Sequence, residues 1–206
     1  MNLSDKEFLK VINGLNNPFK LQDFILSLSY NAGERLSVHD VAEFRKGDCL
    51  EAAVFAVLVL KHHGYDAFLV DLEAVRDEDH VLAVYRLNGK YGSIAQSKFM
   101  NLRQRMPVYF SIKELVMSYF NSYFNFFGEL SLRKYSEAFR IDGFFKRFSL
   151  EDVNLIMEIE KQLLKIPHKD LGLNVNLPRV SKEKFWSELE KLPDNVRVGK
   201  RYIGKI

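Results

Sequence analysis

The stretch that decides the fold is GDCLEAAVFAVLVLKHHGYDAFLVDLEAVRDEDHVLAVYRLNGKYGSIAQS, residues 47–97. Its first part, residues 49–62, is apolar on nearly every side and repeats small side chains every three or four residues, which is typical of a buried helix. Three strand-like segments follow, residues 67–72, 80–87 and 91–96, and Asn88-Gly89 between the last two predicts a tight hairpin. This order predicts an α+β fold in which one buried helix packs on a small antiparallel sheet.

The chain on either side of this stretch is expected to be mainly helical. Helices are predicted at residues 4–14 and 18–28, and Ser37 with Asp40 forms a capping box before a third. Beyond Pro107, helices are predicted from Ser111 onward, over about 149–165 and over 181–192, before a basic tail. We therefore expect a core with its N-terminal helices in residues 1–106 and a helical extension packing on it in residues 107–206.

The predicted extension is unusually aromatic. Residues 109–148 hold nearly half of the Phe, Tyr and Trp side chains of the chain. Two interpretations are open: the rings form a second core against the sheet, as large apolar side chains usually do, or they line a hydrophobic groove for a partner or substrate.

The composition argues against several classes of protein. The net charge of +3 does not favour a nucleic-acid binder, and the longest nearly apolar run, residues 49–60, is shorter than the about 20 residues that span a bilayer. The first fifteen residues lack a continuous apolar core of signal-peptide length, which predicts a cytoplasmic location. No metal-ligand spacing and no glycine-rich phosphate loop occurs, so we expect no metal and no cofactor. The oligomeric state stays open.

Cys49 is the single cysteine, so it is either a small buried apolar residue or a reactive thiol. It follows Gly47-Asp48 at the predicted first turn of the buried helix. There the helix dipole lowers the pKa of a thiol, and the free N–H of Cys49 itself can stabilise an oxyanion.

A reactive thiol needs a base, and His80 is the histidine expected to supply it. His62 and His63 lie at the other end of the helix, about 20 Å from Cys49. His39 and His168 are predicted to be solvated surface residues.

His80 opens a strand, where alternation can point its ring at the thiol while Val81 faces the other side. The alternative is an ordinary core or surface histidine.

Four pieces of this pattern, Gly47-Asp48-Cys49, Glu51-Ala52, residues 63–67 and Asp79-His80, resemble the transglutaminase-like cysteine superfamily, a branch of the papain-like fold. The resemblance covers about residues 36–100. It implies that Cys49 is the nucleophile, that His80 is the general base, and that a third residue orients the ring.

The third residue departs from the family pattern, which usually has an Asp on the strand after the hairpin. Counting across the hairpin places Gln96 there, and its amide oxygen can accept a hydrogen bond from the His80 ring. The other interpretation of Gln96 is a polar strand residue making ordinary hydrogen bonds.

Two hypotheses follow. The first is a cysteine hydrolase or acyltransferase that acts on the amide bonds of a peptide or protein substrate through Cys49, His80 and Gln96. Whether water or an amine takes up the acyl group stays open. The second is a catalytically inactive transglutaminase-like module that binds or scaffolds partners through the aromatic residues 109–148.

Overall fold

The computed structural model describes residues 4–125 and 127–173, together with Glu183 and Ser187. Within these residues the helices are α1 (Asp5–Gly14), α2 (Pro18–Leu26), α3 (Val38–Glu43), α4 (Cys49–His62), α5 (Ile112–Phe120), α6 (Asp142–Phe145) and α7 (Asn154–Leu163), with a 3-10 turn at Met100–Leu102. The strands are β1 (Ser29–Tyr30), β2 (Lys46–Gly47), β3 (Asp66–Ala74), β4 (His80–Leu87), β5 (Lys90–Ile94), β6 (Arg105–Tyr109), β7 (Leu132–Ser136) and β8 (His168–Asp170).

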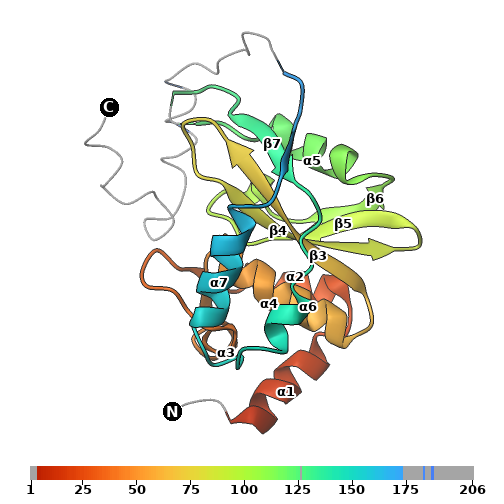
Figure 1. The fold of residues 1–206 in the computed structure, drawn as a ribbon, viewed down its shortest axis with the longest axis vertical. Coiled ribbons are helices and arrows are strands. Elements are labelled where there is room, and N and C mark those ends of the chain that lie inside the picture. Colours follow the sequence, from red (N-terminus) through yellow and green to blue (C-terminus); the bar gives the residue numbers. More distant parts are fainter. Residues whose placement is uncertain (1–3, 126, 174–182, 184–186, 188–206) are drawn as a thin grey trace.

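One six-stranded antiparallel sheet organises these elements, in the order β6-β5-β4-β3-β7-β8. Figure 1 shows α5 on one side of this sheet and α4, with α2, α6 and α7, on the other. The short strands β1 and β2 pair in parallel as a separate ribbon, which sets Tyr30 opposite Gly47. The predicted α+β class is confirmed at this level of detail.

Two hydrophobic cores lie on the two faces of the sheet. On β4, Val81 and Ala83 pack with α4 and its neighbours, whereas Leu82 and Val84 pack with α5. Because both faces are covered, β4 is buried from His80 to Tyr85 without the polar alternation of a half-exposed strand.

The central helix α4 has the predicted bounds, and both of its ends are capped. Asp48 and Glu51 exchange N–H to carboxylate hydrogen bonds at 2.9 Å, which closes a capping box around Cys49. At the other end Gly64 adopts a φ of +80° while Tyr65 N–H donates to the Leu60 carbonyl, the arrangement of a Schellman motif.

The Asn88-Gly89 hairpin is confirmed, since both residues have positive φ values, 50° and 78°. Such values favour the right-handed twist of a two-residue hairpin. The capping box of Ser37 and Asp40 is also present. The third predicted strand is shorter than expected, because β5 ends at Ile94.

The segment after residue 107 is not only helical, which corrects the prediction for that region. β6 begins at Arg105 and runs across the expected boundary, and β7 and β8 extend the same sheet beyond β3. The helix from Ser111 ends at Phe120, and α7 begins at Asn154 without a side-chain cap. The helix predicted over residues 181–192 lies outside the described residues, apart from Glu183 and Ser187.

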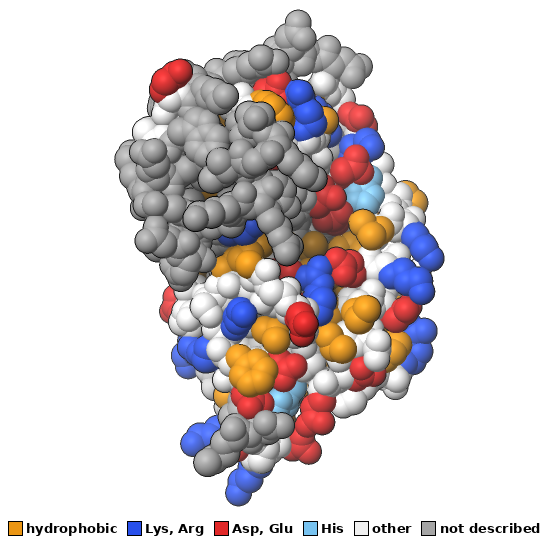
Figure 2. Space-filling model, turned by 90° about the vertical axis from the view of Figure 1, so that its left-hand side faces the viewer, with side chains coloured by type: hydrophobic (Ala, Val, Ile, Leu, Met, Phe, Trp, Pro, Cys, Tyr) orange, Lys and Arg blue, Asp and Glu red, His pale blue; other side chains and the backbone are white. Residues whose placement is uncertain are grey.

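Most described aromatic residues of 109–148 are buried in the two cores or pack against them while partly exposed. Tyr119, Tyr123, Tyr135 and Phe144 are buried, whereas Phe110 is 71% exposed. On the face drawn in Figure 2, hydrophobic side chains form small groups separated by charged ones. Within the described part of the chain, no helix combines the length and the apolar character needed to cross a bilayer.

Candidate functional site

The site is centred on Cys49, the first residue of α4, which is partly exposed. The N–H of Val81, the second residue of β4, hydrogen-bonds the sulfur and favours the thiolate. The Cys49 sulfur therefore lies beside the start of β4, where His80 is the first residue.

The side chain of His80 does not follow the expected direction. Val81 faces α4, and His80 shares the opposite face with Leu82, where its ring packs edge-on against Tyr119 of α5. This is the reverse of the predicted alternation. Among the described residues, no hydrogen bond joins the Cys49 thiol to the His80 ring.

A backbone carbonyl holds the His80 ring. The Nε2–H of His80 donates to the carbonyl oxygen of Leu102 at 2.7 Å. Because a carbonyl oxygen only accepts, this bond places the ring proton on Nε2 and leaves a lone pair on Nδ1. Nδ1 takes part in no hydrogen bond with the described residues. The ring is thus fixed in the tautomer that can receive a proton at Nδ1.

Gln96 does not orient His80, which corrects the expected third residue. Its Nε2 donates to the carbonyls of Ile25 and Leu28, at 3.2 and 2.9 Å, and its Oε1 accepts from the N–H of Ser97 at 3.0 Å. Because β5 ends at Ile94, the chain leaves the sheet and carries Gln96 to the carboxyl end of α2. The Leu102 carbonyl takes the place predicted for the Gln96 amide.

Burial keeps the Cys49 thiol and the His80 imidazole neutral. It raises the pKa of the Cys49 thiol to about 12, and the neighbouring Asp48 carboxylate raises it further. Burial lowers the pKa of the His80 imidazole to about 4, since the ring is 4% exposed and its charged form loses hydration. At neutral pH the proton therefore resides on sulfur, and the helix dipole does not outweigh desolvation.

The amino end of α4 keeps donors available for a ligand. Within the described residues the N–H groups of Cys49 and Leu50 donate no hydrogen bond, whereas those of Asp48, Glu51 and Ala52 are all engaged. Two adjacent free N–H groups at a helix N-terminus favour an oxyanion. The free N–H of Cys49 agrees with the expectation from the sequence.

Tyr30 is a site residue that the sequence reasoning missed. The β1–β2 pairing carries it to the site, where burial and the nearby Cys49 raise the pKa of its phenol. The ammonium of Lys98 lies 4.9 Å from its ring centroid and pairs with Glu78 at 2.9 Å. In the sequence Tyr30 is an isolated aromatic residue before Asn31, and nothing around it indicates that it belongs to a functional site.

The prediction that His39 and His168 are solvated surface residues is wrong. His39 is 5% exposed and packs against Phe8 at 4.8 Å between ring centroids. His168 lies in β8, where its Nε2 is 3.1 Å from Asp71 Oδ2. Burial raises the pKa of Asp71 to about 6 although the bond to His168 lowers it.

One group of side chains has the composition of a cation site. Ligand atoms of His39, Asp40 and Glu43 lie within 4.8 Å of one another, the only such set among the described residues. One imidazole and two carboxylates suit zinc or a similar ion. Asp40 already accepts the Ser37 N–H, and His39 Nδ1 is 3.6 Å from Glu43. The separation of 3.6 Å is longer than a hydrogen bond, and the buried Nε2 of His39 has no hydrogen-bond partner among the described residues.

Comparison with known proteins adds no relative. No family model matches the chain, and no curated protein is significantly similar to it.

Proposed function

We propose that this chain is a transglutaminase-like acyl-transfer enzyme in which Cys49 attacks an amide or ester carbonyl and His80 takes up the thiol proton. The observation that carries the proposal is the hydrogen bond from His80 Nε2 to the Leu102 carbonyl. This bond holds the His80 ring in the tautomer whose Nδ1 can accept a proton. His80 also precedes Val81, whose N–H bonds the Cys49 sulfur.

Because the thiol and the imidazole are both neutral at rest, the proposed route is general-base catalysis rather than attack by a preformed thiolate. As the Cys49 sulfur bonds to the carbonyl carbon, its proton passes through one water to His80 Nδ1, since no hydrogen bond joins the thiol to the ring, and the carbonyl oxygen becomes an oxyanion. The free N–H groups of Cys49 and Leu50 stabilise that charge. When the intermediate collapses, Nδ1 returns the proton to the leaving amine or alcohol and a thioester remains on Cys49.

The thioester then reacts with water or with an amine, and His80 removes a proton from either nucleophile. Hydrolysis regenerates the thiol and releases a carboxylic acid, whereas transfer releases a new amide. The Leu102 carbonyl acts as the positioning group throughout, because it keeps Nε2 protonated and the lone pair on Nδ1.

The test is acylation by 4-nitrophenyl acetate, a reactive ester that can acylate a nucleophile without specific substrate recognition. We expect a burst of nitrophenolate and an acetyl group on Cys49, found by mass spectrometry of the digested protein. Cys49→Ala should abolish the adduct, and His80→Ala should slow its formation by about 100-fold or more, the usual contribution of a general base.

His62→Ala is the matched control, since His62 lies at the other end of α4 and bonds Asn13. It should acylate like the parent protein. Equal acylation of the parent and His80→Ala proteins, or an adduct confined to lysine, would overturn the proposal.

A further inference from the structure

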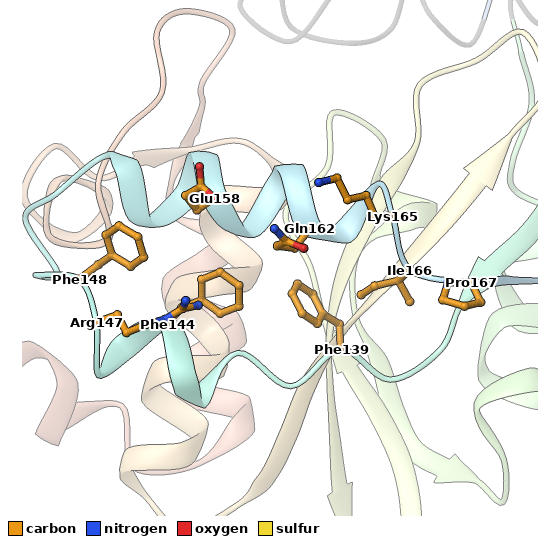
Figure 3. A pocket seen from close by; sticks show the side chains of 9 residues that line it. All are labelled: Phe139, Phe144, Arg147, Phe148, Glu158, Gln162, Lys165, Ile166 and Pro167. Atoms are coloured by element: carbon orange, nitrogen blue, oxygen red, sulfur yellow. The ribbon is translucent and has the colours of Figure 1, made fainter.

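A pocket of about 580 Å³ lies between α7 and the segment that carries α6, well separated in sequence from the residues of the Cys49 site. Figure 3 shows the side chains of Phe139 and Phe144 between that segment and the helix, with Phe148 beside them. The volume falls within the range of small-molecule sites, about 300–1,000 Å³.

The floor of the pocket is aromatic. Phe139 and Phe144 pack edge to face, with ring centroids 5.8 Å apart, and Phe148 and Ile166 complete the apolar lining. Edge-to-face pairs leave ring faces and edges that accept a further ring in the same way. The floor therefore suits an aromatic body better than an aliphatic chain.

The rim of the pocket carries two cations without acidic partners. Arg147 stacks over Phe144, 4.7 Å from its ring centroid, and only its Nε–H donates a hydrogen bond, to the Gly143 carbonyl. Within the described residues neither Arg147 nor Lys165 forms an ion pair. Glu158, the acid in the lining, pairs with Lys161 at 3.2 Å. The rim thus has an excess of positive charge.

We propose that this pocket binds a small aromatic carboxylate or a closely similar aromatic anion. The ring lies among the three phenylalanines, and the anionic group meets the terminal nitrogens of Arg147 on the α6 segment, while the Lys165 ammonium adds positive charge from the carboxyl end of α7. The proposal does not depend on the chemistry of Cys49, because the lining includes neither Cys49 nor His80.

The test compares two fluorescent probes of similar shape on the full chain: the anion 8-anilinonaphthalene-1-sulfonate and the uncharged N-phenyl-1-naphthylamine. We expect saturable binding of the anion at one site and competition by 3-phenylpropionate. Arg147→Gln and Lys165→Gln should each weaken anion binding about two- to five-fold, as for a partly exposed ion pair. Lys165→Gln should leave the uncharged probe unchanged, whereas Arg147→Gln, which also uncovers the Phe144 ring, should weaken the anion relative to the uncharged probe. Phe148→Ala should weaken both probes.

Lys161→Gln is the matched control, since Lys161 is a cation of the same helix that pairs with Glu158 and does not line the pocket. It should bind the anion like the parent protein. Equal affinity for both probes together with indifference to the Arg147 and Lys165 substitutions would overturn the proposal, as would anion binding unaffected by Phe148→Ala. Acetylation of Cys49 in the Arg147→Gln and Lys165→Gln proteins reports on the proposed function separately.

Discussion

At the scale of single residues, the surroundings of Cys49 set the pH range in which its thiol reacts. The unperturbed pKa of a thiol is about 8.5, and burial with the Asp48 carboxylate raises it to about 12 here. We predict that alkylation by iodoacetamide is slow at pH 7 and keeps accelerating above pH 10. An apparent pKa at or below 8.5 would instead indicate a preformed thiolate and contradict the general-base mechanism.

In the same alkylation experiment, Asp48→Asn tests the effect of the Asp48 charge on the thiol while keeping the N-cap of α4. Asn is as good an N-cap as Asp, so α4 should keep its first turn, while loss of the negative charge beside the sulfur should lower the apparent pKa of Cys49. The comparison is Asp40→Asn, because Asp40 is the N3 residue of the capping box of α3 and does not act on the thiol. An unchanged pKa in Asp48→Asn would remove the electrostatic role of that carboxylate.

His80 should make stability depend on pH. Its pKa is about 4 in the folded protein and 6.5 without burial, so the unfolded chain binds more protons between these values. Stability contributed by neutral His80 is therefore complete above pH 6.5 and is lost as the pH falls towards 4, by about 3 kcal/mol. Urea unfolding at several pH values measures it.

The control for this prediction is His80→Gln, whose amide can still donate to the Leu102 carbonyl. Burial raises the pKa values of Asp71 and Asp77 to about 6, so these two groups stabilise the folded state as the pH falls through the same range. They do so in the parent protein and in His80→Gln alike. Their effect cancels in the difference. Parallel pH profiles for the two proteins would show that His80 does not stay neutral on folding.

The sequence predicted the site only in part, for identifiable reasons. Cys49 at the start of α4 and His80 at the start of β4 were placed correctly, because caps and strand starts leave local signals. The direction of His80 was not predictable, since β4 is apolar towards both faces. Leu102 acts through its backbone carbonyl, which no side-chain pattern reveals.

At the scale of elements, the carboxyl end of α4 depends on one glycine. Gly64 has a φ of +80°, and nothing lies within 4 Å of an added Cβ, so the cost of a side chain there is backbone strain alone. We predict that Gly64→Ala lowers the free energy of unfolding by about 1 kcal/mol. Thermal and urea unfolding would measure this.

Gly14→Ala is the matched control for that prediction. Gly14 ends α1, has no positive φ, and also has open space around an added Cβ. Alanine there should leave stability unchanged or raise it, because alanine favours the helix. Equal losses in both variants would mean that strain at Gly64 is not the cause.

The elements themselves divide into those with a local signal and those without one. The helix α4 and the hairpin of β4 and β5 follow from apolar patterning and from Asn88-Gly89. β6 contains Pro107, and β7, with the sequence LRKYS, has two cations in five residues, so neither resembles a strand locally. Their place in the sheet comes from pairing with distant strands, which the local sequence does not encode.

At the scale of the whole molecule, the contact between Asp71 and His168 ties the outermost strand to the centre of the sheet. Asp71 lies on β3 and His168 on β8, with β7 between them. We predict that His168→Ala lowers the free energy of unfolding by about 3 kcal/mol, because it leaves the buried Asp71 carboxyl without its partner. Amide hydrogen exchange in residues 168–171 should also accelerate.

Lys169→Ala is the control for this contact. Lys169 is the next residue of β8 and pairs with Glu137 at the surface, where both side chains are more than half exposed. Such pairs contribute little, so we expect a change within about 0.5 kcal/mol. If the two variants were equally stable, the buried contact would not hold β8 in place.

The position of β3 has a consequence for the synthesis of the chain. Leu72 of β3 pairs with His80 on one side, soon after it in the sequence, and with Tyr135 of β7 on the other. Closing the short loop between Leu72 and His80 costs less entropy than closing the long one between Leu72 and Tyr135. The strands β3, β4 and β5 can therefore assemble on α4 while β7 is still missing. During translation the free edge of β3 is then open to strands of neighbouring nascent chains, until the ribosome has released the residues around Tyr135.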